Sequence, residues 1–233
     1  MACVDASRVR ADSRQRMLRA GLAIARRSGL RAVTVRAVAT RARANLGSFV
    51  HHFGTREAFL DQMVEDWYAP LLERLQLSVD EAAPAPVRLR AFCAALIDFV
   101  LDNRSMILHL VLDAAAGEAP ALHFLKTLPA RHPALLLRLI SETQSSGAIA
   151  RDDDPANVML FIVGALALPA VALTGVERAG ARRSSFGAQM LARAIGRDSV
   201  GRRLDWVFAG LQADHVRAAA GARPTRRRPP KEA

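Results

Sequence analysis

The fold is decided by the stretch Asn45–Phe53, which reads NLGSFVHHF. Asn45 is a residue type that caps helix N-termini, because its side-chain oxygen accepts a hydrogen bond from a backbone N–H of the first turn. Phe49 and Phe53 are four positions apart, so on a helix they share one face and can anchor it to other helices. The other positions then lie on or near the outer face, and Gly47 lets the backbone come close to a partner. The stretch predicts a short helix with one buried face and one open face.

Two helices are expected before this stretch. Thr34 is a good N-cap for a short helix that ends near Ala42. An earlier helix ends at Ser28 and Gly29, since glycine readily takes the left-handed conformation found just past a helix C-terminus. Three short helices within the first 55 residues fit a helix-turn-helix module, whose last helix enters the major groove of DNA. The earlier helix carries one apolar face, made of Met17, Leu18, Gly21, Ile24 and Ala25.

Helical patterns continue after the stretch. Gly54 and Thr55 end one helix and cap the next, which we expect over 56–77. Pro70 lies inside that helix and removes a backbone donor, so a kink is expected there. No alternating run typical of strands follows, and the chain is predicted to be all-α. Further helices are expected at about 86–102, 104–116, 119–147, 154–176, 186–196 and 200–220, with Pro129 and Pro133 dividing the third.

The net charge of +11 is confined to the two ends of the chain. Residues 1–60 hold 12 Arg and Lys against 3 Asp and Glu, residues 217–233 hold 6 against 1, and the middle is mildly acidic. A basic head on a near-neutral body favours a protein that docks on DNA phosphates with one part only. The expected organisation is a disordered arm over 1–12, a helix-turn-helix DNA-binding domain over 13–56, a helical bundle over 57–220 and a disordered basic tail over 221–233.

Composition and motifs exclude several classes of protein. Hydrophobic residues make up 51% of the 233 residues, which is enough for a large core. The two cysteines, Cys3 and Cys93, exclude a disulfide framework, and with no visible signal peptide they favour a cytoplasmic protein. Phosphate-binding loops, HExxH, CxxC and Gly-x-Ser-x-Gly are missing, so we expect no enzyme and no cofactor. Asp152–Asp154 precede Pro155 and are interpreted as a helix cap, with no metal site expected.

One apolar run has two possible interpretations. From Pro155 to Val176 the sequence has no charged residue, and this length could span a bilayer. Pro169 inside the run, its many alanines and the lack of a second such run favour a buried helix instead, with no membrane partner. A helix that is apolar all round can be buried at a subunit interface. We therefore expect a homodimer, paired across a two-fold axis through the helices at 154–176 and 200–220.

The segment from Arg14 to Tyr68 resembles the N-terminal domain of TetR-family transcriptional repressors. It covers about a quarter of the chain, and the remainder resembles the family only in the number and length of its helices. The resemblance implies a ligand-responsive repressor that binds a pseudo-palindromic operator in double-stranded DNA as a homodimer and is released by a small-molecule effector. The matching elements are the first helix, Gly29, Thr34-Val35-Arg36, the stretch Asn45–Phe53 and Gly54-Thr55-Arg56-Glu57-Ala58-Phe59-Leu60.

The resemblance also implies roles for individual residues. Two positions depart from the family pattern. Arg43 stands where the family usually has glycine in the tight turn, so a left-handed backbone there would cost about 1–2 kcal/mol, and its side chain can reach a phosphate. Val50 stands where an aromatic is frequent, and it offers apolar contact that suits a thymine methyl group. The implied DNA contacts are Val35 and Arg36 at a groove edge or the backbone, Asn45, Leu46, Gly47 and Ser48 at the start of the recognition helix, Val50 and His51 on bases, and His52 and Arg56 on phosphates.

The body is expected to hold the effector. Polar or soft groups interrupt its apolar runs, and buried polar groups need partners that a ligand can supply. Met, Phe and Leu dominate, so a small apolar or aromatic effector is the better match. Taken singly, His109 and His123 are more simply explained as structural histidines, and Cys93 as a small core filler. The candidate ligand-binding residues are Asp98, Met106, His109, Asp113, His123 and Met159.

Two other functions compete with a ligand-responsive repressor. A nonspecific architectural DNA-binding protein would share the basic head, but it has no need of a large apolar body. A membrane-associated regulator would use the uncharged run as an anchor.

Overall fold

A computed structural model describes residues 2–78, 80–151, 153–180 and 184–212, with the side chains of residues 2–11 left aside. Over these residues the chain is helical, and its one β feature there is an isolated bridge between Ile149 and Gln212. The expected all-α class is confirmed. The expected basic tail over 221–233 and the last part of the helix expected at 200–220 lie outside the described residues.

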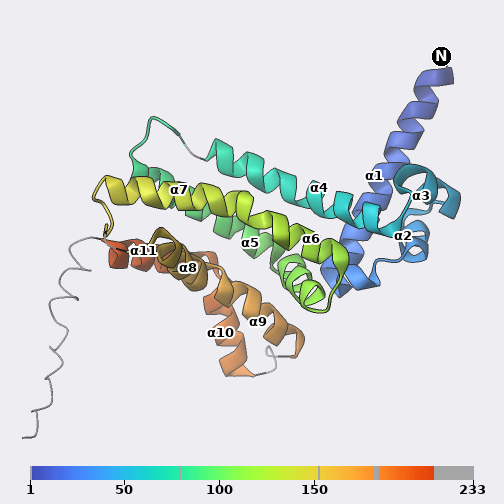
Figure 1. The fold of residues 1–233 in the computed structure, drawn as a ribbon. Helices are drawn as coiled ribbons and strands as arrows, with labels where there is room; N and C mark the ends of the chain where they lie inside the picture. Colours follow the sequence, from blue (N-terminus) through green and yellow to red (C-terminus); the bar gives the residue numbers. More distant parts are fainter. Residues whose placement is uncertain (1, 79, 152, 181–183, 213–233) are drawn as a thin grey trace, which may run out of the picture.

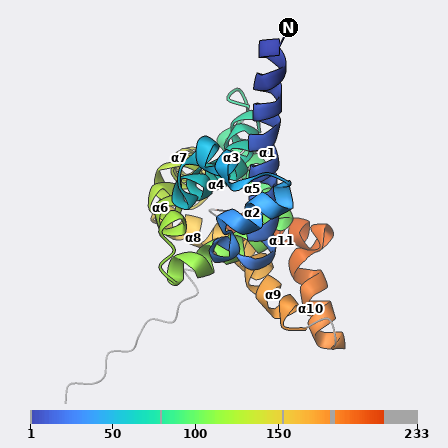
Figure 2. The ribbon, with the colours of Figure 1, turned by 90° about the vertical axis from the view of Figure 1, so that its right-hand side faces the viewer.

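The head consists of α1 (Ala2–Ser28), the short 3-10 helix η1 (Leu30–Ala32), α2 (Val35–Ala42) and α3 (Leu46–Phe53). We expected a disordered arm over residues 1–12, but α1 begins at Ala2, because the arginines and alanines of this segment continue the helix without a breaker. Figure 2 looks onto this end of the molecule, where α2 and α3 lie in front of the body. The predicted three-helix module is therefore present, with a longer first helix.

Three polar side chains set the helix starts that the sequence predicts. Thr34 Oγ1 accepts a hydrogen bond from Ala37 N at 3.2 Å and caps α2. Asn45 Oδ1 accepts one from Ser48 N at 2.6 Å and caps α3. Thr55 Oγ1 accepts one from Ala58 N at 3.1 Å and caps α4. Each cap satisfies a backbone donor that the first turn leaves unpaired, so the head's boundaries follow from local chemistry.

The body is a bundle built around α5. That helix packs against α1, α4, α6, α7, α9 and α11, and Figure 1 shows α4, α5 and α7 running side by side. In the same view α10 packs on α9, on the side of the bundle away from α4. The elements are α4 (Arg56–Leu77), α5 (Ala85–Ala115), α6 (Ala119–Thr127), the 3-10 helix η2 (Leu128–Ala130), α7 (His132–Ser145), α8 (Pro155–Leu166), α9 (Leu168–Arg178), α10 (Ser185–Ile195) and α11 (Arg197–Leu211).

One expected helix boundary in the body is wrong. The sequence predicts helices at 86–102 and 104–116, yet α5 runs unbroken from Ala85 to Ala115. Asn103 is the reason, because its side chain is satisfied without ending the helix. Its Nδ2 donates to Phe99 O at 2.9 Å, and its Oδ1 accepts from Trp67 Nε1 at 2.8 Å. An asparagine that bonds this way stabilises the contact between α5 and α4 instead of breaking α5.

The prolines divide the later segments. Pro129 and Pro133 separate α6, η2 and α7, as expected. The expected helix at 154–176 is two helices, because the chain turns at Ala167 and Pro169 lies in the first turn of α9. By length and composition the stretch Pro155–Arg178 could cross a membrane, and 28% of its most apolar window is buried inside the chain. Much of this apolar surface is therefore left uncovered by the chain itself.

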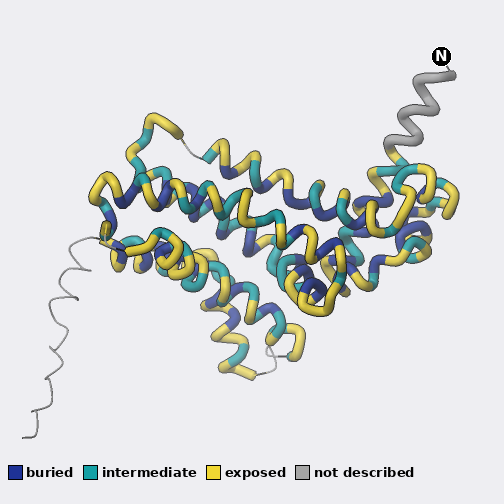
Figure 3. The backbone as a smooth tube through the Cα atoms, viewed as in Figure 1, coloured by how far each residue is buried: buried dark blue, intermediate teal, exposed yellow. Residues whose placement is uncertain are grey.

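The buried side chains form one cluster that runs through head and body (Figure 3). Phe49 and Phe59 are each almost fully buried where α3 meets α4, with ring centroids 5.0 Å apart. Gly21 lets α1 approach α4 closely, because a Cβ at that position would lie 2.6 Å from the Phe59 ring. The head is thus packed onto the start of α4 and shares the body's core.

Polar contacts fix the junction segment Gly29–Val33, which links α1 to α2, onto the body. Arg56, the first residue of α4, donates from Nε to Val33 O at 2.8 Å and from Nη2 to Leu30 O at 2.9 Å. Its Nη1 donates to Glu118 Oε1 at 2.8 Å. Arg56 therefore joins the head to the segment before α6.

Asp113 completes this junction from α5. Its carboxylate is buried and accepts a hydrogen bond from Leu30 N at 2.6 Å. Gly29 has a φ of +84°, and a Cβ there would lie 2.7 Å from Asp113 Oδ2. A side chain at position 29 is therefore excluded both by its backbone conformation and by the carboxylate.

We predict that Asp113→Ala lowers the free energy of unfolding by about 1.5–3 kcal/mol, because it removes a charge-assisted hydrogen bond and leaves the Leu30 N–H buried without a partner. Urea denaturation measures this change. Asp102→Ala on the same helix removes an exposed ion pair with Arg197 and should cost less than about 1 kcal/mol. Equal losses in the two variants would contradict the role given to Asp113.

Candidate nucleic-acid interface

Helix α3 presents one face to the core and one to solvent. Phe49 is 1% exposed, and Phe53 packs beside it with ring centroids 5.3 Å apart. On the other face Leu46 is 49% exposed and Val50 is 59% exposed. His51 is exposed as well. Apolar side chains this exposed on a helix held from behind are available to a partner, as a recognition helix requires.

A concave surface, which encloses a volume of about 590 Å³, lies beside the start of α3. Its lining includes Ser13 and Arg16 of α1, two residues outside the DNA contacts that the family resemblance implies. Ser13 Oγ lies 3.4 Å from Ser48 Oγ, so α1 reaches α3 at this place. In the sequence, Ser13 and Arg16 could have been identified by their helical spacing on the polar side of α1. The other lining residues are Arg43, Ala44, Asn45, Gly47, Ser48, His51 and His52.

Arg43 adopts the left-handed conformation, with φ 52° and ψ 48°. Among the residues that the structure describes, it is the one non-glycine residue with a positive φ. The backbone at Arg43 is therefore left-handed, which costs a residue with a Cβ about 1–2 kcal/mol. Its exposed side chain lies on the concave surface beside Asn45, where a positive charge adds to the partial positive charge at the N-terminus of α3.

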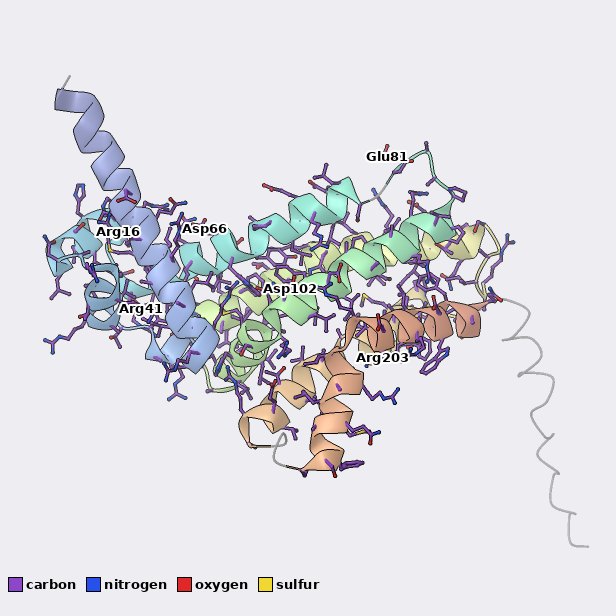
Figure 4. The ribbon with its side chains drawn as sticks, turned by 180° about the vertical axis from the view of Figure 1, so that it is seen from behind. Arg16, Arg41, Asp66, Glu81, Asp102 and Arg203 are labelled. Atoms are coloured by element: carbon purple, nitrogen blue, oxygen red, sulfur yellow. The ribbon has the colours of Figure 1, made fainter. Side chains whose placement is uncertain are left out.

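Exposed arginines gather on the head, whereas the body also carries exposed acidic residues. The exposed arginines of the head include Arg36, Arg41 and Arg43. Figure 4 places Arg16 and Arg41 on the head, and Asp66, Glu81 and Asp102 on the body. Arg16 pairs with Asp12 in the preceding turn, and the pair is largely exposed to solvent. A basic surface around α3 favours contact with phosphates.

The two adjacent histidines lie differently. His51 is exposed and His52 is half-buried, and their ring centroids are 5.4 Å apart. His51 therefore lies on the open face of α3 with Val50. Val35, at the start of α2, is half-buried and packs against the core, while Arg36 beside it is exposed.

The role expected for Arg56 is corrected by its bonding. The family resemblance implies a contact between its guanidinium and a DNA phosphate. In the structure that group is engaged by two backbone carbonyls and by Glu118. A phosphate would have to displace these partly buried bonds, so Arg56 acts as a junction residue. Its long-range partners could not be read from sequence.

The six candidate ligand residues do not come together. Asp98 pairs with Arg74 at 3.1 Å and with Arg197 at 2.6 Å near the surface. Asp113 belongs to the junction. His123 is exposed on α6, and Met106 and Met159 lie buried and half-buried on α5 and α8. The pattern of polar interruptions along the chain therefore did not identify one pocket.

His109 lies at the contact between α5 and the end of α1. Burial lowers its pKa, and the neighbouring Arg178 lowers it further. Arg178, the last residue of α9, contacts the His109 ring and donates to Arg26 O at 3.0 Å. A cation that bonds the last carbonyls of α1 stabilises that helix end. His109 is therefore a structural histidine, as the simpler interpretation had it.

A cavity of about 110 Å³ lies elsewhere, between α5, α7 and α8. Burial raises the pKa of the Cys93 thiol to about 12 and lowers the pKa of His132 to about 4, so both side chains are neutral at neutral pH. Neither was a candidate ligand residue, because nothing near them in sequence marks a pocket. The lining includes Cys93, Ile97, Val100, His132, Ile162 and Leu166.

The described residues contain no group of three or more His, Cys, Asp or Glu that could hold a metal ion. Asp154 Oδ1 accepts a hydrogen bond from Ala156 N at 2.8 Å and caps α8, which confirms the helix-cap interpretation for that residue. Asp152 lies outside the described residues.

Sequence comparisons relate part of the chain to bacterial transcriptional regulators. The family model for bacterial regulatory proteins of the tetR family matches residues 17–63. The HTH-type transcriptional repressor DhaR of Mycobacterium sp. (strain GP1) is 27% identical over 100 residues, an alignment that covers 42% of this chain. The chain spans half the length of that curated relative, 50%.

Solved structures share the fold over head and body. The fatty acid degradation regulator FadR from Bacillus halodurans superposes with a TM-score of 0.64 at 14% identity, covering 85% of this chain and 99% of that one. The ketosteroid transcriptional regulator KstR2 of Mycobacterium tuberculosis gives a TM-score of 0.60 at 20% identity, covering 85% and 94%. At such identities the likeness concerns the fold alone. The match over residues 17–63 identifies the head as the N-terminal domain of the TetR family of bacterial regulatory proteins.

Proposed function

We propose that the protein is a cytoplasmic transcriptional repressor that binds a pseudo-palindromic operator as a homodimer and is released by a small-molecule effector. The observation that carries the proposal is the open face of α3. Leu46, Val50 and His51 are exposed there, beside a basic concave surface that includes Arg16 and Arg43. A rigid helix with exposed contacts and a cationic surround is suited to the major groove.

The proposed contacts with DNA follow from this placement. Val50 and His51 meet base edges, and Asn45, Leu46, Gly47 and Ser48 bring the N-terminus of α3 toward the backbone. Phosphate contacts come from Arg16, Arg36 and Arg43, together with Ser13 and His52. Val35 supports α2 from its half-buried position. Arg56 is left out of this set, because its guanidinium is bonded within the protein.

The helices α8 and α11 pack against each other, and both carry exposed apolar side chains. These side chains support the proposed dimer. Leu160 on α8 is 66% exposed and Trp206 on α11 is 68% exposed. Phe161 and Val163 extend this surface along α8. Large exposed apolar surfaces on a globular protein mark interaction sites. Pairing two copies here would cover the uncharged stretch that also has the length of a membrane span.

An effector in the body would act through the helices that reach the head. α4 is the direct link, since it begins at Arg56 in the junction and continues through the bundle to Leu77. The effector can change DNA affinity only by its difference in affinity for the two states, typically about 1–3 kcal/mol of coupling.

Selection of bound DNA from a random pool tests the proposal. We expect the full chain to select a two-fold-symmetric motif whose half-sites lie about one helical turn apart. On that DNA, His51→Ala should weaken binding by about fivefold or more and relax the base preference at one position of each half-site, because a base contact is lost. Fluorescence anisotropy measures the affinities.

His123→Ala is the matched control, since it removes an exposed histidine from α6, away from α3. It should leave DNA affinity unchanged. Enrichment of no motif would instead support a nonspecific architectural protein, and recovery of the chain in the membrane fraction would support a membrane-associated regulator.

Arg43→Gly separates the charge of this side chain from its backbone. Glycine suits a φ of 52°, so thermal stability should stay the same or rise. DNA affinity should fall, and the slope of log affinity against log salt should become shallower by about one unit. Arg43→Lys keeps the charge and should retain most of the slope. An unchanged slope in Arg43→Gly would contradict the proposed contact between Arg43 and a phosphate.

Trp206→Arg tests the dimer surface. A charge in the centre of an apolar interface lacks a partner, so the variant should sediment as a monomer and lose most of its affinity for the symmetric DNA. Phe186→Arg is the control, because Phe186 is exposed on α10, outside the two helices proposed to pair. A dimeric Trp206→Arg variant would contradict this interface.

A further inference from the structure

The cavity between α5, α7 and α8 has a nearly uniform apolar lining. Ile97 and Val100 of α5 and Ile162 and Leu166 of α8 form its walls. Each of these four side chains is buried in the protein. No charged side chain belongs to its lining among the described residues. An ion would lose its hydration there without a counter-charge, so the chemistry of the walls selects uncharged molecules.

His132, at the start of α7, adds one strong hydrogen-bonding group to this apolar space. Its Nδ1 lies 2.6 Å from the Tyr68 hydroxyl, and that bond occupies one ring nitrogen. Within the part of the chain that the structure describes, the Tyr68 hydroxyl is the polar partner of the ring, and Nε2 is left for an occupant. Burial keeps the ring neutral, as its low pKa indicates, so Nε2 pairs with a neutral polar group.

The volume limits the size of the occupant. A dry cavity of roughly 150 Å³ lined by Leu, Ile and Phe binds benzene. At about 110 Å³ this cavity is of a similar order, so one six-membered ring approaches its capacity. A fused-ring system or a long acyl chain would need the helices to move apart.

We propose that this cavity is a binding site for a small uncharged molecule, about the size of one six-membered ring, which is apolar except for one hydroxyl or carbonyl group hydrogen-bonded to His132. The occupant's ring contacts the aliphatic walls supplied by α5 and α8. That the occupant regulates DNA binding rests on the proposed function, whereas binding itself rests on the cavity.

Contacts made by His132 and by its neighbour Arg131 join the site to α4. Arg131 donates to both carboxylate oxygens of Glu65, at 2.8 and 2.7 Å. The Arg131 guanidinium also lies over the Tyr68 ring, 5.2 Å from its centroid. An occupant that shifts His132 therefore acts on α4 through Tyr68, and α4 carries Arg56 at the junction with the head.

The test titrates the full chain with three probes of similar size, namely phenol, toluene and benzoate, with calorimetry and thermal unfolding as readouts. Phenol should bind one molecule per chain and raise the Tm by about 2–4 °C at saturation. Toluene has the shape of phenol without the hydroxyl and should bind about three- to tenfold more weakly. Benzoate should give no shift, since its charge cannot be desolvated in this cavity.

Variants assign the binding to this cavity. His132→Phe keeps an aromatic ring but removes Nε2, so phenol should fall to the affinity of toluene while toluene still binds, which also reports that the cavity is intact. His123→Phe makes the same change at an exposed position and should alter neither affinity. Ala167→Leu adds volume at the lining and should abolish binding of both probes.

Each contrary result overturns the inference. Equal affinities for phenol and toluene would contradict the proposed hydrogen bond to His132. Binding of benzoate would contradict the proposed exclusion of charged molecules. Binding that survives Ala167→Leu would place the probe elsewhere, and no binding of phenol would leave no site. DNA selection is carried out without probe, so a chain that binds phenol but selects no DNA refutes the proposed function alone, and the reverse result refutes the cavity alone.

Discussion

The position of the recognition helix depends on how the body holds the junction segment Gly29–Val33. Arg56 and Asp113 bond backbone groups of this segment, and both side chains reach it from body helices. Because these bonds are partly or fully buried, they are stronger than exposed ion pairs and resist small displacements. These bonds tie the head to the start of α4 and the end of α5, and the proposed transmission of effector binding from body to DNA would pass through them.

The head could be predicted from sequence because local chemistry determines it. Thr34, Asn45 and Thr55 are N-caps, and each bonds a backbone N–H three residues ahead in the chain. The four-residue spacing of Phe49 and Phe53 fixes the buried face of α3 in the same local way. Signals of this kind lie within a few consecutive residues, so the sequence correctly predicted the helix starts at all three caps.

The body was less predictable because its decisive contacts join distant residues. Asn103 looked like a helix boundary, but Trp67 on another helix satisfies it within α5. Arg56 looked like a phosphate ligand, but its acceptor Glu118 lies 62 positions away. The cavity at His132 could not be found for the same reason, since its lining comes from three helices. Polarity along the chain indicates which groups need partners, and only the packing of the helices shows which partners they have.

The bonding at the junction has a consequence for building hybrid regulators. A chimera that joins this head to a foreign body after Arg56 would leave behind Glu118 and Asp113, the two acidic partners that the body supplies. The transplanted Leu30 N–H would then be buried without an acceptor, and the guanidinium without its counter-charge. A recipient scaffold accepts this head only if it offers carboxylates at both places, so the head can be exchanged only between bodies that carry these two acidic residues.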